Sequence, residues 1–279
     1  MKQVAYRLRW CGLWFLILAS SISAFSQTPV TQGKADNTYI EGAVLWQQLS
    51  GERIALSYQA FALARMLLDQ DLKVNRRIRK PRAVIVDLDE TILDNSRYWG
   101  ELLKNKLHYP QGRDEWLNRA EAPATPGSVE FLRYAVSRGV ETFYITNRSA
   151  PLKQVTAAHL KRLGFPNVTD QTLLMHTDPN NPSKEARRQR VGAKYRIVLL
   201  MGDNLVDFSD VFDSSRTIDG RIAAVDQNKA QFGSRFIVLP NPMYGNWENA
   251  IYDYNLKLSD AEKVTKRKSA LKAFSRAVN

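Results

Sequence analysis

The stretch that decides the fold is Val84-Ile85-Val86-Asp87-Leu88-Asp89-Glu90-Thr91. Residues 83–86 form an uninterrupted apolar run, which is typical of a parallel strand buried on both faces. Such a strand cannot end in two buried, ionised carboxylates unless something compensates their charge. At the carboxyl end of a parallel strand they face the crevice where open α/β folds bind ligands. We therefore expect Asp87 and Asp89 to belong to a functional site.

Short apolar runs recur downstream and predict four further strands, at Thr142–Ile145, Leu173–Met175, Ile197–Met201 and Phe236–Leu239. Helical patterns lie between several of them, at Ser128–Val136, Leu152–Leu163 and Lys184–Val191. This alternation predicts the α/β class, with a Rossmann-like parallel sheet covered by helices on both faces. Residues 98–124 are rich in aromatic side chains and break the alternation, so we expect a small helical cap insertion there.

A helical region precedes the first strand, from about Tyr39 to Leu72, and Ser50-Gly51 divides it. Its leucines recur at spacings of four and seven, which predicts one buried face made of Leu45, Leu49, Leu56, Leu63 and Leu67. The main domain would then span residues 39–258, and residues 27–38 are expected to form a polar linker.

The first 26 residues have the features of a secretory signal. Lys2, Arg7 and Arg9 precede an uncharged apolar run over residues 11–25, and Ala24 and Ser26 suit a small-residue cleavage site. Cleavage after Ala24 or an uncleaved anchor are the alternatives, although the run is short for crossing a bilayer. Cys11 is the only cysteine and stands at the start of the apolar run, whereas a lipid attachment site would follow the run. We expect a periplasmic or secreted protein without disulfides or a lipid anchor.

The chain has 279 residues and a formal net charge of +12, three charges of which lie in the expected signal. A basic protein favours anionic partners, and charge alone leaves phosphate esters, nucleic acid and an anionic membrane surface open. Residues 259–279 predict a basic terminal helix, with Ser259 and Glu262 in capping-box spacing. No nucleic-acid-binding motif accompanies it, so a solvated helix is the preferred interpretation.

A second motif has the same pattern as the first, an apolar run followed by acidic residues. After the apolar residues 199–201, Gly202 permits a tight turn, and Asp203 and Asp207 follow. Between the two motifs, a strand ends in Thr146 and Asn147, and Lys184 stands near a helix start. Carboxylate oxygens of this kind suit Mg²⁺, which takes few protein ligands together with water and phosphate.

The order Asp-x-Asp, Thr, Lys, Gly-Asp-x-x-x-x-Asp resembles the haloacid dehalogenase superfamily. More narrowly, residues 86–98 and 201–208 resemble the two signatures of the class C bacterial acid phosphatases, which include lipoprotein 5′-nucleotidases. The resemblance runs from about Leu45 to Tyr252 and includes residues 233–245.

This resemblance implies a magnesium-dependent phosphomonoesterase. Asp87 would attack phosphorus and form an aspartyl-phosphate, and Asp89 would protonate the leaving alcohol and later deprotonate water. The metal ligands would be the Asp87 carboxylate, the Asp89 carbonyl and Asp203, with Asp207 orienting a metal-bound water or Lys184. Lys184 and the backbone N–H groups near Thr146 would supply positive charge to the phosphate, although Thr146 alone also fits a capping role, and Lys194 is an alternative lysine.

The expected substrates are nucleoside monophosphates or other small phosphate monoesters. Candidate substrate-binding residues are Asn147, Trp116, Tyr244 and Tyr98, of which Trp116 and Tyr244 resemble an aromatic clamp around a nucleoside. Aromatic residues are as often part of a core. A broad phosphomonoesterase, a phosphotransferase and a non-catalytic envelope binding protein are the competing functions. A histidine phosphatase is disfavoured, because His108, His159 and His176 lie in no Arg-His-Gly type motif.

Overall fold

The computed structural model describes residues 36–274, except residues 76 and 179. The expected signal peptide and residues 27–35 of the expected linker lie outside this part of the chain. The linker ends earlier than predicted, since Thr38 already belongs to a 3₁₀ helix, η1 (Thr38–Ile40). No helix in the described part is both long and apolar enough to span a membrane.

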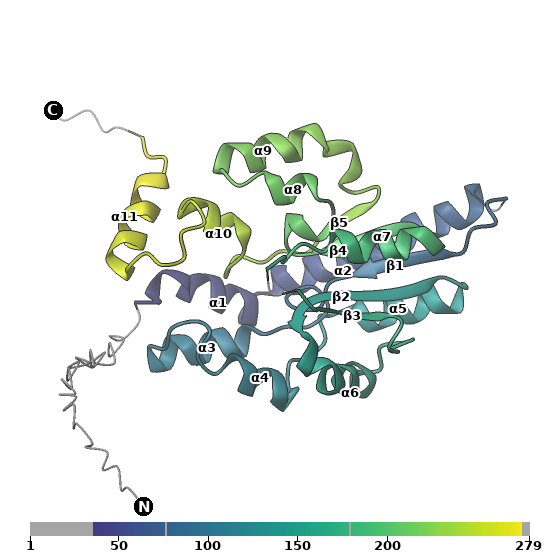
Figure 1. Ribbon diagram of the computed structural model, residues 1–279, viewed down its shortest axis with the longest axis horizontal. Helices are drawn as coiled ribbons and strands as arrows, with labels where there is room; N and C mark the ends of the chain where they lie inside the picture. The colour runs from purple at the N-terminus through teal and green to yellow at the C-terminus, as the bar shows by residue number, and fades with distance from the viewer. Residues whose placement is uncertain (1–35, 76, 179, 275–279) are drawn as a thin grey trace, which may run out of the picture. The chain divides into compact units, whose positions relative to one another are not determined.

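The core of the fold is a five-stranded parallel sheet with the order β3-β2-β1-β4-β5 (Figure 1). Its strands are β1 (Arg82–Val86), β2 (Glu141–Ser149), β3 (Leu173–His176), β4 (Arg196–Gly202) and β5 (Phe236–Val238). All five occur where the apolar runs predicted them. Because β1 lies in the middle, Asp87 emerges at the centre of the carboxyl edge.

Helices cover both faces of the sheet, which confirms the predicted α/β architecture. In β1, Val84 and Val86 pack with α2 (Gly51–Val74), α5 (Ser128–Ser137) and α6 (Lys153–Leu163). Ala83 and Ile85 pack on the other face with α7 (Glu185–Lys194), α8 (Val211–Ser214) and α9 (Ile218–Gln227). The short 3₁₀ helices of this region are η2 (Ala150–Leu152), η3 (Leu205–Asp207) and η4 (Lys229–Gln231).

The N-terminal helical region divides where expected but buries a different face. Between α1 (Glu41–Leu49) and α2, the Ser50 side chain caps α2 by accepting a hydrogen bond from Arg53 N at 3.1 Å. The predicted leucine face is wrong for Leu45, Leu49 and Leu56, which are exposed. Leu63 and Leu67 are half-buried against the core, as predicted. The buried face lies one residue further round the helix and carries Ser57, Ala60, Phe61, Ala64 and Leu68. Small side chains let α2 pack closely against α5 and the sheet, so apolarity alone misplaced the contact.

The cap follows the Asp87–Asp89 loop directly and contains α3 (Ser96–Asn105) and α4 (Arg113–Arg119). Its aromatic residues form a third core with α1, made of Ile40, Val44, Tyr98, Trp99, Leu102 and Met243. Met243 belongs to the segment after β5. The N-terminal helix, the cap and the late loop therefore pack together beside the carboxyl edge of the sheet.

The chain ends in α10 (Asn246–Ile251) and α11 (Asp260–Ala270). The predicted capping box at Ser259 and Glu262 is present, with Ser259 N donating to Glu262 Oε2 at 2.8 Å. The helix is shorter than predicted, however, because it stops at Ala270 and residues 271–274 are not helical. Residues 275–279 lie outside the described part.

Candidate active site

The predicted catalytic residues meet at the carboxyl edge of the sheet. They line a cleft of about 620 Å³ with Asp87, Asp89, Asn147, Lys184, Asp203, Asp207 and Tyr244 in its walls. These residues come from the ends of β1, β2 and β4, from the start of α7 and from the loop after β5. Parallel strands bring their carboxyl ends together, so segments more than a hundred residues apart share one site.

Lys184 joins two of the four acidic residues. Its Nζ forms an ion pair with Asp87 Oδ1 and lies 2.6 Å from Asp207 Oδ1. All three side chains are buried. Burial alone would lower the pKa of the Lys184 ammonium, but the carboxylates of Asp207 and Asp87 raise it above its ordinary value. Lys184 is therefore a fixed positive charge next to Asp87.

Gly202 allows Asp207 to approach the end of β4. A Cβ at residue 202 would collide with the Asp207 carboxylate, so the glycine is required by this close approach. The other oxygen of Asp207 accepts a hydrogen bond from Asn204 N at 3.0 Å. Asp207 is thus held on both sides, which suits the orienting role predicted for it.

The carboxylates of Asp87, Asp203 and Asp207 form a compact cluster. One oxygen from each lies within 4.8 Å of the others. Burial, together with the neighbouring Asp207 and Asp89, raises the pKa of Asp87 to about 7 despite the opposing effect of Lys184. Burial and the charges of Asp207 and Asp87 raise the pKa of Asp203 well above its ordinary range. Three carboxyl groups share the contact with one ammonium, so ionising all three would leave an excess of negative charge in the cluster.

Asp89 lies apart from that cluster and pairs with Arg148, a residue to which the sequence analysis gave no role. Arg148 Nη2 lies 2.6 Å from Asp89 Oδ1, and Arg148 Nε lies 3.1 Å from both Asp89 oxygens. Arg148 is only 1% exposed. Burial alone would raise the pKa of Asp89, but the guanidinium of Arg148 brings it below the ordinary value. Asp89 is therefore held ionised in this structure.

The two predicted site residues of β2, Thr146 and Asn147, differ in their exposure to the cleft. Thr146 is fully buried within β2, and its Oγ1 accepts a hydrogen bond from Arg148 N at 3.1 Å, so it caps no helix. Asn147 is exposed and lines the cleft. Its side chain contacts the segment before α7, because Nδ2 donates to Pro182 O at 2.9 Å and Oδ1 accepts from Arg187 at 2.6 Å.

The aromatic residues of the cap form a narrow hollow beside Asp89, with a volume of about 60 Å³. Trp116 and Tyr244 both line it, as predicted for a clamp, but Tyr244 stacks on Trp99 with the ring centroids 4.6 Å apart. Tyr98 is buried and donates to Gln111 O at 3.1 Å, which is the behaviour of a core residue. A nucleobase is larger than this hollow. Among the predicted clamp residues, Tyr244 also lines the wide cleft.

Hydrogen bonds tie the hollow to the acidic loop. Trp116 Nε1 donates to Asn95 Oδ1 at 2.9 Å, and Asn95 Nδ2 donates to Asp89 Oδ1 at 2.9 Å. Tyr244 OH donates to Glu90, which is also buried. Burial and the nearby Asp89 raise the pKa of Glu90 to about 8. The cap and the late loop are therefore attached to Glu90 and Asn95, which follow Asp87 and Asp89 in the chain.

Comparisons with known proteins agree with this geometry. The family model for acid phosphatases of HAD superfamily subfamily IIIB matches residues 11–247. The structure of the class C acid phosphatase from Bacillus anthracis is 44% identical, with a TM-score of 0.80, and the match covers 84% of this chain and 97% of that one. A second structure of that enzyme, with tungstate bound, matches equally well. The chain belongs to the subfamily IIIB acid phosphatases of the HAD superfamily.

A plant relative is more distant. The stem 28 kDa glycoprotein of Glycine max is 27% identical over 84% of this chain and 83% of its own length. The chain is thus a phosphomonoesterase of the class C acid phosphatase type, with the fold expected from its two acidic motifs. HAD phosphatases generally use a divalent metal, and the residues of this acid phosphatase fit one. The buried cluster of Asp87, Asp203 and Asp207 offers hard oxygen donors and an excess of negative charge.

Proposed function

We propose that this acid phosphatase is a magnesium-dependent enzyme of the 5′-nucleotidase type that acts in the cell envelope. The observation that most directly supports this reaction is the contact of Lys184 with both Asp87 and Asp207 beside the carboxylate of Asp203. The proposed location depends on the sequence of the first 26 residues, and the proposed substrate class depends on the aromatic residues around the cleft.

Asp87 is the proposed nucleophile. Its carboxylate stands at the centre of the sheet edge, and Lys184 donates to one of its oxygens, which fixes the direction of the other. Attack on phosphorus would form an aspartyl-phosphate and release the alcohol, and water would then release phosphate and restore Asp87. A divalent metal bound by Asp87 and Asp203 would supply positive charge for the phosphate oxygens.

Asp89 is the proposed general acid and base. It would donate a proton to the leaving oxygen in the first half-reaction and accept one from water in the second. Its contact with Arg148 orients both carboxylate oxygens but also favours the ionised form. Acidic solution restores the protonated form, so the reaction is expected to be fastest at acidic pH.

Tyr244 is the proposed contact for the nucleoside. It lines both the aromatic hollow and the wide cleft that contains Asp87. The hollow is too small for a base, so we place the base against Tyr244 on the side of the wide cleft. Stacking of a base on an aromatic ring contributes about 1–3 kcal/mol and tolerates any base.

A comparison of substrates tests this assignment. We expect Tyr244→Ala to lower kcat/KM for nucleoside 5′-monophosphates by roughly 5- to 150-fold, while kcat/KM for glycerol phosphate changes little. Tyr244→Phe keeps the ring and should retain the nucleotide preference. Equal losses for both substrates would contradict nucleoside binding by Tyr244 and would favour a broad phosphomonoesterase. Product analysis with added nucleoside would separate hydrolysis from phosphotransfer.

A further inference from the structure

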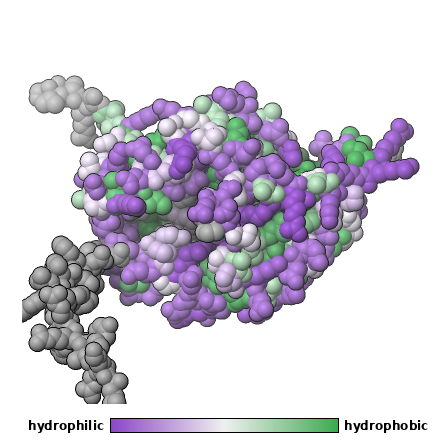
Figure 2. Space-filling model, in the orientation of Figure 1, coloured by the Kyte–Doolittle hydropathy of each residue, from purple (hydrophilic) through white to green (hydrophobic). Residues whose placement is uncertain are grey.

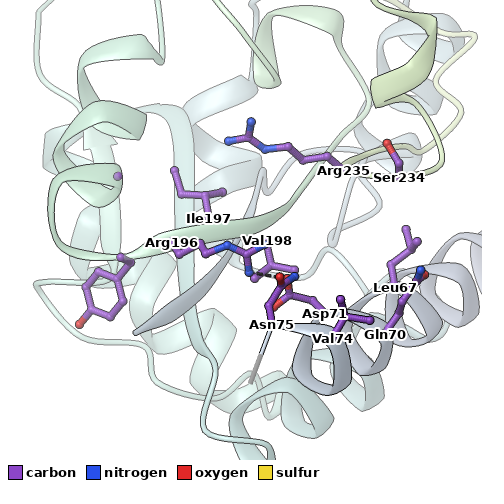
Figure 3. A pocket seen from close by; sticks show the side chains of 12 residues that line it. Leu67, Gln70, Asp71, Val74, Asn75, Arg196, Ile197, Val198, Ser234 and Arg235 are labelled. Carbon is purple, nitrogen blue, oxygen red and sulfur yellow. Dashed lines mark hydrogen bonds and ion pairs between the residues drawn. The ribbon is translucent and has the colours of Figure 1, made fainter. Parts of the chain in front are cut away.

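A second polar hollow lies at the amino edge of the sheet, opposite the catalytic residues. Its volume is about 600 Å³, and it is lined by the end of α2, the turn from α7 into β4 and the residues before β5 (Figure 3). β1 and β4 start beside it and end at the catalytic cleft. The hollow is therefore separate from the site of phosphate ester hydrolysis.

Three arginines from distant parts of the chain gather at this edge. Arg82 and Arg196 are direct partners in the register of β1 and β4. Arg235 lies on the other side of β4, just before β5, and its carbonyl oxygen accepts a hydrogen bond from Leu200 N of β4 at 2.9 Å. Like charges placed opposite each other in a sheet are destabilising unless an acid compensates them.

One carboxylate compensates two of these cations. Asp71 is buried and pairs with Arg82 Nε at 2.6 Å and with Arg196 Nη1. Asp71 Oδ1 also accepts a hydrogen bond from Asn75 Nδ2 at 2.7 Å. Figure 3 shows Arg196 reaching across the hollow to Asp71. Asp71 therefore accepts three hydrogen bonds, two of them from the arginines.

Arg235 is exposed at the edge of the hollow. Within the described residues no carboxylate forms an ion pair with it, and its side chain runs along the wall of the hollow above Ile197 (Figure 3). Burial and the neighbouring Arg196 lower the pKa of Arg235, which is the expected effect of two adjacent guanidinium groups. The site thus has an excess of positive charge.

The surroundings increase this excess. Lys80 Nζ donates to Gly192 O in the wall of the hollow at 2.6 Å, and Arg77 and Arg79 precede it in the sequence. The end of α2 and the start of β1 form a projection with a hydrophilic tip, on the right in Figure 2. Lys80 and Arg82 of the basic run of residues 76–82, which the proposed reaction does not use, therefore lie next to the hollow.

We infer that this hollow binds the phosphate group of a small anion through Arg235 and Arg196, with Gln70 and Ser234 as polar neighbours. Guanidinium groups bind phosphate oxygens through paired hydrogen bonds, and one from the start of β4 and one from the turn before β5 can share one phosphate group. The volume accommodates more than a bare phosphate ion. The phosphate group can belong to a soluble molecule or to a lipid headgroup.

The test is a titration of the ¹⁵N-labelled protein with inorganic phosphate, at constant ionic strength set with chloride. We expect saturable shifts of the amide signals of Gly192 and Ser234 in the native protein. Arg235→Gln should weaken this response roughly tenfold or more, as expected for loss of a charge-assisted hydrogen bond. Arg97→Gln, an exposed arginine of α3, is the control for charge and should leave it unchanged.

A second arm separates the two sources of the phosphate group. Sedimentation with phosphatidylglycerol vesicles, compared with phosphatidylcholine vesicles, measures binding to a headgroup. Binding in either arm that Arg235→Gln weakens and Arg97→Gln does not weaken supports the site. Responses in neither arm, or responses that Arg235→Gln leaves unchanged, overturn it. The amide spectrum of each variant reports its folding, so a misfolded variant is recognised directly.

Discussion

Arg148 holds both carboxylate oxygens of Asp89, with its Nε 3.1 Å from each and its Nη2 2.6 Å from Oδ1. The pair is formed by a fully buried cation and an acid that borders the cleft. It orients the proposed general acid, and it also opposes its protonation. Removing Arg148 should therefore change both the orientation of Asp89 and the pH at which it is protonated.

Arg148→Gln should move the alkaline limb of the kcat/KM profile to higher pH. Without the guanidinium, the pKa of Asp89 rises, so a larger fraction of Asp89 is protonated at a given pH. We also expect kcat/KM at the optimum to fall by about tenfold or more, because the carboxylate loses its fixed orientation. Arg148→Lys keeps the charge and should leave the limb near its original position. An unchanged limb in Arg148→Gln would contradict the acid role of Asp89.

Lys184→Met should lower kcat/KM by roughly 10²–10³-fold, because it removes the positive charge that contacts Asp87 and Asp207. Lys194→Met is the matched control, since Lys194 is exposed at the end of the same helix, α7. We expect it to keep nearly full activity. Comparable losses in both variants would mean that the loss does not come from contact with the carboxylates.

Mg²⁺ should raise the thermal unfolding midpoint of the protein by several degrees. A ligand that binds the folded state alone, at a hundred times its Kd, stabilises it by about 2.7 kcal/mol. The stabilisation should disappear in Asp203→Asn, which removes one carboxylate of the cluster. Asp226→Asn, an exposed acid of α9, should respond like the native protein. A full response in Asp203→Asn would place the metal elsewhere.

His159 should make the fold less stable in acid. Its Nε2 bonds to Ala122 O at 2.9 Å, and its buried Nδ1 has no hydrogen-bond partner among the described residues. Burial therefore lowers the pKa of His159 to about 4, below its ordinary value of 6.5. Between these values the unfolded chain binds the proton and the folded chain does not. The stability contributed by neutral His159 is thus complete above pH 6.5 and is lost as the pH falls toward 4.

Urea unfolding of the native protein and of His159→Gln at several pH values measures this effect. The free energy of unfolding should fall less steeply between pH 6.5 and 4 in the variant. Parallel curves would show that His159 does not titrate differently in the folded and unfolded chains. Other acids contribute to both curves equally, so the difference between them is the quantity of interest.

The five strands and the acidic residues could be predicted because each depends on local sequence. An apolar run that ends in Asp87, or in Gly202-Asp203, predicts both a buried strand and a site at its end. The buried face of α2 could not be predicted in the same way. It depends on small side chains such as Ala60 and Ala64, which pack closely but carry little hydrophobic signal.

The side chains that contact the acidic residues could not be predicted from the sequence either. Arg148 lies two residues after Thr146, but its ion pair with Asp89 could not be predicted because it joins β2 to the loop after β1. An arginine within a strand that ends at the acidic edge was the signal that could have identified it. The contact of Glu90 with Tyr244 joins residues 154 positions apart, and only the packing of the late loop reveals it.

The central claim is that Asp87 is the nucleophile of a metal-dependent phosphatase. The most direct test is phosphate release from a nucleoside 5′-monophosphate by the native protein and by Asp87→Asn, each with Mg²⁺ and with EDTA. We predict release that requires Mg²⁺ in the native protein and falls to background in Asp87→Asn under both conditions. Release that continues in Asp87→Asn would contradict the claim.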